Sequence, residues 1–191
     1  MNQVYIYDGS FDKGDLGWML VREAASRCGF ELDLPYDFEE AQIGRTDKGK
    51  PFFVDIPVEF SLSHSGVMWM CMFSDRPCGL DLQAVEEKRD YTKIVKHRYT
   101  PEEQHYVELW GREGFYDIWV RKEAFGKCMG TGIFSDMPSM VDEKTDLKPV
   151  LEWKGLCYDM QALDISPEMK CAFCMIKNQD EPEQIELRIL G

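Results

Sequence analysis

The chain has 191 residues, with 22 Lys and Arg against 35 Asp and Glu, and a formal net charge of −13. An apolar content of 44% excludes a disordered chain, and the length allows one domain or two small ones. No apolar run approaches the ~20 residues that cross a bilayer, and the acidic start lacks the features of a signal peptide.

The first half of the chain predicts strands around one helix. Val4–Tyr7 is expected to be a strand, and Asp15–Cys28 an amphipathic helix that ends at Gly29. Val67–Phe73 is a continuous apolar run, as in a central strand. Cys78–Gln83 is a further strand, and the short turn between these two predicts that they pair as a hairpin.

The second half begins with helix signals and continues with strands. Thr100–Glu103 supplies an N-cap Thr, a Pro at the first position and a Glu at the third. Phe115–Met129 is a second predicted helix, and strand-like runs follow at Cys157–Leu163 and Lys170–Ile176. This order predicts an α+β fold with mainly antiparallel strands.

Cysteine usage favours a reducing, cytoplasmic setting. Seven cysteines, an odd number, form no paired framework in a chain of this length. Cys171 and Cys174 make one Cys-x-x-Cys, which also occurs in zinc half-sites and redox pairs. In a strand they point to opposite faces, and no second pair completes four zinc ligands. We therefore interpret both as core cysteines.

The acidic charge is concentrated at the two ends of the chain. Residues 1–43 carry 3 basic and 9 acidic side chains, and residues 131–191 carry 6 and 12. Residues 44–130 are nearly balanced with 13 and 14, and they include a basic stretch from Lys88 to Arg98. An anionic ligand is expected in this middle part. No broad basic surface is available for nucleic acid.

Two segments carry candidate metal ligands. Asp81 and Gln83 share one face of their predicted strand, and oxygen ligands of this kind suit Mg²⁺. The alternative is the polar outer face of an ordinary strand. In the later helix, Glu123 and Lys127 are four residues apart, with Trp119 one turn earlier on the same side. They predict either a surface ion pair or a metal-binding Glu beside a Lys that neutralises a phosphate.

Two further sets of residues could take part in binding or catalysis. Ser63 and His64 could bind a phosphate at a strand edge. A Ser-His hydrolase pair is not expected, because adjacent strand residues point to opposite faces. Glu103 completes the capping box with Thr100, and a carboxylate at a helix start can also face a cleft.

In order and spacing, four segments resemble the 4′-phosphopantetheinyl transferases of the surfactin-synthetase type. The segments are Gly49-Lys50-Pro51, Phe60-Ser-Leu-Ser-His64-Ser, Gly79-Leu-Asp81-Leu-Gln83 and Trp119-Val-Arg-Lys122-Glu123-Ala-Phe-Gly-Lys127. The resemblance implies an enzyme that transfers phosphopantetheine from coenzyme A to a serine of an acyl or peptidyl carrier protein, releasing 3′,5′-ADP. It also implies that a single chain, acting as a monomer, folds into two similar α+β halves, residues 1–97 and 98–191, which together form a pseudo-dimer.

The resemblance also implies roles for individual residues. Asp81 and Glu123, with Gln83, fall on the ligands of Mg²⁺, which Mn²⁺ could replace. Glu103 falls on the proposed general base, and Lys127 on a lysine that contacts the pyrophosphate and takes part in catalysis. The residues that fall where coenzyme A is held are Lys13, Lys50, Ser63, His64 and Lys127.

The chain departs from the family pattern at Gln83, where many relatives have Glu. It is also shorter before Asp15, and Leu80 and Leu82 stand where Ile or Val is commoner. Gln83 leaves open an alternative function, a non-catalytic module that binds coenzyme A or a carrier protein. A Mg²⁺-dependent phosphoesterase built on the same groups is a third hypothesis.

Overall fold

The computed structural model describes the chain except for residues 8, 12–13, 133–135 and 179–183. In chain order its helices and strands are β1 (Asn2–Tyr7), α1 (Leu16–Glu31), β2 (Ile43–Arg45), β3 (Pro51–Phe53), β4 (Glu59–Ser65), β5 (Met68–Ser74), β6 (Cys78–Ala84), α2 (Thr92–Arg98), α3 (Pro101–Met129), β7 (Val150–Trp153), β8 (Leu156–Ala162), β9 (Met169–Ile176) and β10 (Glu186–Leu190).

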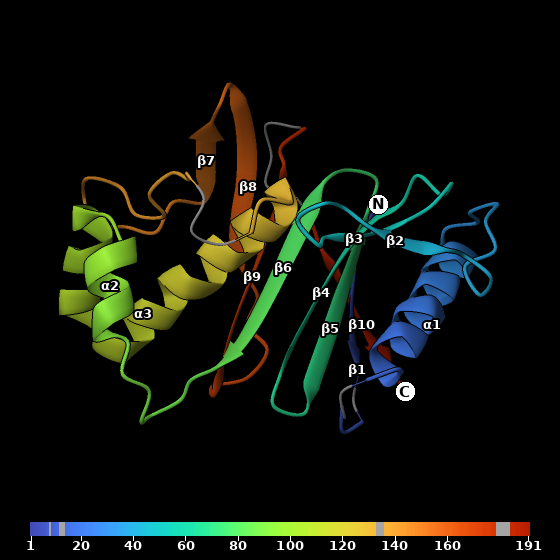
Figure 1. Cartoon of the computed structure of the whole chain (residues 1–191), viewed down its shortest axis with the longest axis horizontal. Helices are drawn as coiled ribbons and strands as arrows, with labels where there is room; N and C mark the ends of the chain where they lie inside the picture. The colour runs from blue at the N-terminus through green and yellow to red at the C-terminus, as the bar shows by residue number, and fades with distance from the viewer. Residues whose placement is uncertain (8, 12–13, 133–135, 179–183) are drawn as a thin grey trace.

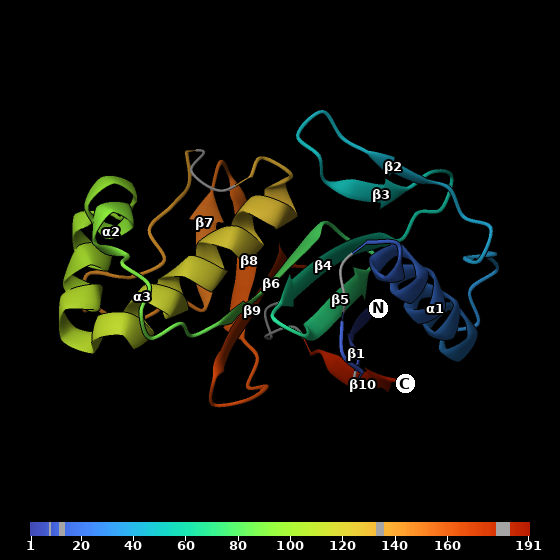
Figure 2. The same cartoon turned by 60° about the horizontal axis from the view of Figure 1, so that its bottom comes forward.

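Two four-stranded sheets, each with a long helix beside it, make up most of the described structure (Figure 1). The first sheet has the order β10-β1-β5-β4, and the second has the order β6-β9-β8-β7. Their pairings are antiparallel except for β1 with β10, which is parallel. Figure 2 shows α1 against the first sheet and α3 across the second. The predicted α+β class with mainly antiparallel strands is confirmed.

Three apolar clusters hold these layers together. One lies between α1 and the first sheet, and another between α3 and the second sheet. The third joins the sheets to each other, with Val4 and Met70 from the first and Leu80 and Phe173 from the second. Burial of apolar surface therefore fixes the position of β6, whose leucines face the first sheet, relative to β4 and β5.

The predicted hairpin of residues 67–73 with 78–83 is wrong. β5 pairs with β1 on one edge and with β4 on the other, so neither edge is open to β6. β6 instead crosses to the second sheet and pairs with β9. In return, β10 from the end of the chain pairs with β1. The division of the chain into two halves at residues 97–98 stays a prediction. Each proposed half contributes one strand to the sheet of the other, β6 to the second sheet and β10 to the first.

Both predicted helices are longer than expected. α1 continues through Gly29 to Glu31. Gly29 serves packing instead of ending the helix, because a Cβ at this position would lie 2.7 Å from the Phe38 ring. The capping box at Thr100 and Glu103 begins α3 as predicted. The same helix runs on to Met129 across a kink at Gly111, where φ is 59°. No described helix is long and apolar enough to cross a membrane.

The two cysteines of the Cys-x-x-Cys pattern are core residues, as predicted. Cys174 belongs to the cluster under α3, whereas Cys171 belongs to the cluster between the sheets. They lie on opposite faces of β9, which is the geometry that three-residue spacing gives in a strand. All seven cysteines are free thiols, and six of them are buried.

Candidate active site

The site lies where β6 packs against the second half of α3. At Gly79 the two elements come so close that a Cβ would overlap the backbone of Ala124 and Cys128. Because side chains alternate along a strand, Asp81 and Gln83 share the face of Gly79. The close approach at Gly79 therefore brings both residues alongside the helix.

A cavity of about 290 Å³ lies between β4, β6 and α3. Its lining residues are Leu62, Ser63, His64, Asp81, Leu82, Gln83, Trp119, Glu123 and Lys127. Most of the site residues predicted from three separate segments therefore meet in one cavity. Trp119 joins them, as its helical spacing from Glu123 predicted.

Asp81 is almost fully buried and uses its two oxygens very differently. Its Oδ1 accepts hydrogen bonds from Ser63 Oγ at 2.9 Å and from Lys127 Nζ at 2.7 Å. Its Oδ2 is buried and has no hydrogen-bond partner among the residues that the structure describes. A buried carboxylate oxygen without a partner carries a desolvation cost, so this atom is poised to accept a further donor or a cation.

Glu123 stands near Asp81 and is partly buried. Burial raises the pKa of the Glu123 carboxyl, and the charge of Asp81 raises it further, while Lys127 lowers it. Two neighbouring carboxylates with an unpartnered buried oxygen, together with the Gln83 amide, fit a hard divalent cation. The described residues include no group of three or more His, Cys, Asp and Glu that could hold a metal. In the candidate site the third metal ligand would be the amide oxygen of Gln83, which is not one of these four residue types.

Two lysines supply positive charge to the site. Lys127 Nζ donates to the carbonyl oxygens of Leu62 and Leu80 as well as to Asp81, so it ties α3 to β4 and β6. Lys50 Nζ pairs with Glu59 at 3.1 Å. Both lysines line a second cavity of about 210 Å³, which shares Leu62 and Lys127 with the first. An anion that spans the two cavities would meet both cations.

Ser63 and His64 point in different directions, as neighbours on a strand must. Ser63 is buried, and its hydroxyl is bonded to β6. His64 is exposed, and its ring packs 5.0 Å from the ring of Phe11. Both side chains line the cavity, and His64 is the more exposed of the two.

Glu103 is fully buried and does not line this cavity. Its Oε2 pairs with Lys122 Nζ at 2.9 Å and accepts from the backbone of Thr100, and its Oε1 accepts from the backbone of Met140 at 2.9 Å. Its carboxylate therefore holds the start of α3, the later part of α3 at Lys122 and the segment at Met140 together.

Several residues that were not predicted as individual site residues also contribute. Ser61 and Ser65 alternate with Ser63 along β4 and also bond to β6, a pattern that the sequence displays at two-residue spacing. Arg89, within the basic stretch, lies 5.3 Å from the Trp119 ring and so places a cation beside the cavity. No local signal linked Arg89 to Trp119, because thirty residues separate them.

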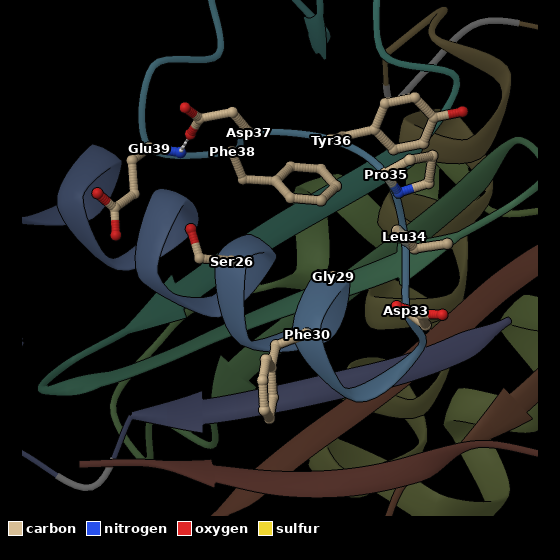
Figure 3. Close-up of a pocket in the computed structure, with 10 residues that line it drawn as sticks. All are labelled: Ser26, Gly29, Phe30, Asp33, Leu34, Pro35, Tyr36, Asp37, Phe38 and Glu39. Carbon is tan, nitrogen blue, oxygen red and sulfur yellow. Dashed lines mark hydrogen bonds between the residues drawn. The ribbon is translucent and has the colours of Figure 1, made fainter.

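Lys13 lies outside the described residues. A larger cavity of about 570 Å³ occurs far from the candidate site, between α1 and residues 33–39 (Figure 3). Its lining includes Asp33, Asp37 and Glu39 but no Lys or Arg. This lining would repel phosphate groups, so size alone does not locate the site.

Known proteins match the chain over most of its length. The 4′-phosphopantetheinyl transferase Sfp of Bacillus subtilis is 29% identical over 183 residues, which is 90% of this chain and 77% of that protein. The 4′-phosphopantetheinyl transferase gsp of Aneurinibacillus migulanus is 27% identical over 71% of this chain. The chain spans 56% of the length of gsp and 52% of another Bacillus subtilis 4′-phosphopantetheinyl transferase.

Carboxylates and lysines that meet between β4, β6 and α3 are groups that suit phosphoryl-transfer chemistry. The model of the 4′-phosphopantetheinyl transferase superfamily matches residues 77–174, just over half of the chain. The chain belongs to this superfamily, and Sfp is one of the relatives that it resembles. The matched region includes Asp81, Glu103, Glu123 and Lys127.

Proposed function

We propose that this enzyme transfers 4′-phosphopantetheine from coenzyme A to a serine of an acyl or peptidyl carrier protein, with Mg²⁺, and releases 3′,5′-ADP. The observation that carries the proposal is the unpartnered Oδ2 of Asp81 in a cavity shared with Glu123 and Lys127. Coenzyme A brings a pyrophosphate, whose charge requires cations, and the carrier brings the attacking hydroxyl.

Each proposed role follows from the chemistry of a pyrophosphate. Asp81 and Glu123, with the Gln83 amide, would hold Mg²⁺ or Mn²⁺, which when bound neutralises charge on the pyrophosphate. Lys127 would stabilise the charge that develops on the leaving ADP. Lys50 would lie beside the nucleotide of coenzyme A and His64 would contact its phosphates, and Lys13 is proposed as a phosphate-binding residue from the sequence alone.

The group that takes the serine proton is open to experiment. Glu103 remains the predicted general base, although its carboxylate is buried and paired with Lys122. A general base must come within about 3 Å of the hydroxyl, or within one water of it. The buried position supports a role in positioning α3.

The decisive experiment is a mass-shift assay with apo carrier proteins. Enzyme, coenzyme A and Mg²⁺ should convert a carrier to a product heavier by one phosphopantetheine. Asp81→Asn, which keeps the side-chain volume, should lower the rate by at least about 100-fold, the usual scale for losing a transition-state electrostatic contact. No mass shift with carriers of fatty acid, polyketide and peptide synthases would refute the proposal.

Gln83 supports one alternative, a module that binds coenzyme A or a carrier protein without turnover. An amide contributes no charge to a metal site, and the Gln83 amide nitrogen donates to Ser65 Oγ at 3.3 Å. Tight coenzyme A binding with no product at high Mg²⁺ would favour this alternative. Gln83→Glu should then create activity, whereas in a working transferase it should lower the Mg²⁺ concentration needed for half-maximal rate.

A Mg²⁺-dependent phosphoesterase is excluded if coenzyme A stays intact without a carrier.

We further propose that the enzyme acts as a monomer in the cytoplasm, without membrane or nucleic acid partners. Free thiols throughout the chain support a reducing compartment.

A further inference from the structure

Three serines of β4 alternate along the strand and all bond to the backbone of β6. Ser61 Oγ accepts from the backbone nitrogen of Leu80 at 2.9 Å, and Ser63 Oγ from that of Leu82 at 3.1 Å. Ser65 Oγ accepts from Ala84 at 2.9 Å. β4 and β6 belong to different sheets, so these side chains replace the backbone ladder that would join neighbouring strands.

The three serines provide hydrogen-bond acceptors for backbone N–H groups of β6. Only one edge of β6 is paired, with β9, and the backbone at Leu80 and Leu82 is buried. A buried backbone N–H without a partner costs roughly 1–3 kcal/mol. The serine ladder of Ser61, Ser63 and Ser65 satisfies these donors and fixes how far β6 slides along β4.

Ser63 differs from Ser61 in the acceptors that its hydroxyl faces, which are Asp81 Oδ1 at 2.9 Å and, at the longer distance of 3.5 Å, the carbonyl oxygen of Leu82. Besides accepting from Leu82, its hydroxyl donates to Asp81 Oδ1 at 2.9 Å, whereas Ser61 makes no bond to a candidate metal ligand. A hydroxyl carries a single hydrogen, so Ser63 cannot donate to a phosphate while it donates to Asp81. Both donors to Asp81, Ser63 and Lys127, bind Oδ1, which leaves Oδ2 as the unpartnered oxygen.

We infer that Ser63 is a positioning residue, which orients the Asp81 carboxylate so that Oδ2 is presented to a divalent cation, and that it is not a ligand of coenzyme A. The inference rests on the proposed metal role of Asp81. Hydrogen bonds to the ligands of a metal commonly change metal affinity by about 10–100-fold, so a single hydroxyl at this position has a measurable effect.

Ser63→Ala and Ser61→Ala form a matched pair for the test. Each removes one rung of the serine ladder, so both should lower the unfolding temperature by a similar amount. Titration calorimetry with Mn²⁺, in the absence of coenzyme A, should show about tenfold weaker binding for Ser63→Ala. Ser61→Ala should bind Mn²⁺ within about twofold of the wild type, because its hydroxyl does not touch Asp81.

Kinetics supply a second readout. Ser63→Ala should raise the Mg²⁺ concentration for half-maximal rate, with little change in the KM for coenzyme A at saturating Mg²⁺. Unchanged Mn²⁺ affinity together with a raised KM for coenzyme A would overturn the inference and make Ser63 a phosphate ligand, while leaving the proposed function intact. A wild-type enzyme that binds no Mn²⁺ would overturn both.

A third variant guards against misfolding of Ser63→Ala. Ser63→Cys nearly keeps the side-chain size but offers a weaker donor, so its Mn²⁺ affinity should fall between those of the wild type and Ser63→Ala. A Ser63→Cys protein with wild-type unfolding temperature and wild-type Mn²⁺ affinity would contradict the positioning role.

Discussion

At the scale of single residues, the candidate site contains a carboxylate, Glu123, whose ionised form lowers the stability of the folded protein. Glu123 is partly removed from water and lies near the charge of Asp81, and both effects raise the pKa of its carboxyl. A raised pKa for an acid means that the ionised form costs stability in the folded chain. A divalent cation would offset that cost, so the destabilising pair is the expected signature of a functional site.

Glu123→Gln should therefore stabilise the metal-free protein while abolishing transfer. The gain should be largest above the pKa of Glu123 in the folded protein and should shrink as the pH falls through it, because the wild-type carboxyl then becomes protonated. Unfolding temperatures at a series of pH values measure the effect.

Glu143→Gln is the matched control, since Glu143 is exposed and does not line the candidate cavity. It should leave the unfolding temperature and the rate unchanged at every pH. A Glu123→Gln protein that is less stable than the wild type in metal-free buffer at neutral pH would contradict the assignment of Glu123 as a strained carboxylate.

At the scale of elements, α3 carries several of the proposed site residues, and a buried ion pair joins its two parts. Glu103 at its start and Lys122 near its end pair at 2.9 Å, and both side chains are almost fully buried. Lys122 also lies 5.6 Å from the Tyr99 ring. The pair spans the kink at Gly111, so it fixes the second half of the helix, with Glu123 and Lys127, relative to the first.

Glu103→Gln should lower stability by roughly 3–5 kcal/mol, because it leaves Lys122 buried without a counter-charge. The double variant with Lys122→Met should regain part of this loss. For a positioning role we expect the acidic limb of the pH profile of kcat/KM to persist in the single variant. Loss of that limb with stability unchanged would instead identify Glu103 as the general base.

The close contact of β6 with α3 leaves no room for a side chain at Gly79. Gly79→Ala would place a methyl group on the backbone of Ala124 and Cys128, forcing β6 and α3 apart. We expect a large loss of stability and, in protein that still folds, weakened Mn²⁺ binding. Gly17→Ala in α1 is the control, because its Cβ would meet only Phe11 at 3.6 Å and Ala favours a helix by up to about 1 kcal/mol. Equal behaviour of the two variants would contradict the close-packing argument.

At the scale of the whole molecule, the net charge of −13 conceals where the cations lie. The basic stretch of residues 88–98 includes α2, on which Lys93 and Lys96 are exposed, and Arg89, which packs on Trp119 at the cavity. An acidic carrier approaching the cavity would meet positive charge there. The whole-chain sum argues against anionic ligands only when this distribution is ignored.

Lys93→Glu with Lys96→Glu should raise the KM for the carrier several-fold and leave the KM for coenzyme A unchanged. The effect should weaken as salt concentration rises, because exposed charges are screened. Lys144→Glu reverses an exposed charge of the same sign and should change neither value. An unchanged KM for the carrier in the double variant at low salt would refute docking on α2.

Patterns that depend on near neighbours could be predicted from the sequence. Alternation along a strand put Asp81 and Gln83 on one face, helical spacing aligned Trp119, Glu123 and Lys127, and the capping signals located the start of α3. These features hold because the backbone geometry of strands and helices is repetitive, so a few residues suffice to define a face or an end.

Which strand pairs with which was decided by the tertiary structure. Residues 78–84 suit a hairpin with the preceding strand by local criteria, yet both edges of β5 are occupied, and β6 pairs with β9. The burial of Glu103 with Lys122 and the serine ladder of β4 on β6 likewise join residues distant in sequence. The sequence by itself determined the chemical groups and their local faces. Only the competition among all buried surfaces and backbone hydrogen bonds decided which of those groups meet, because it is settled over the whole chain at once.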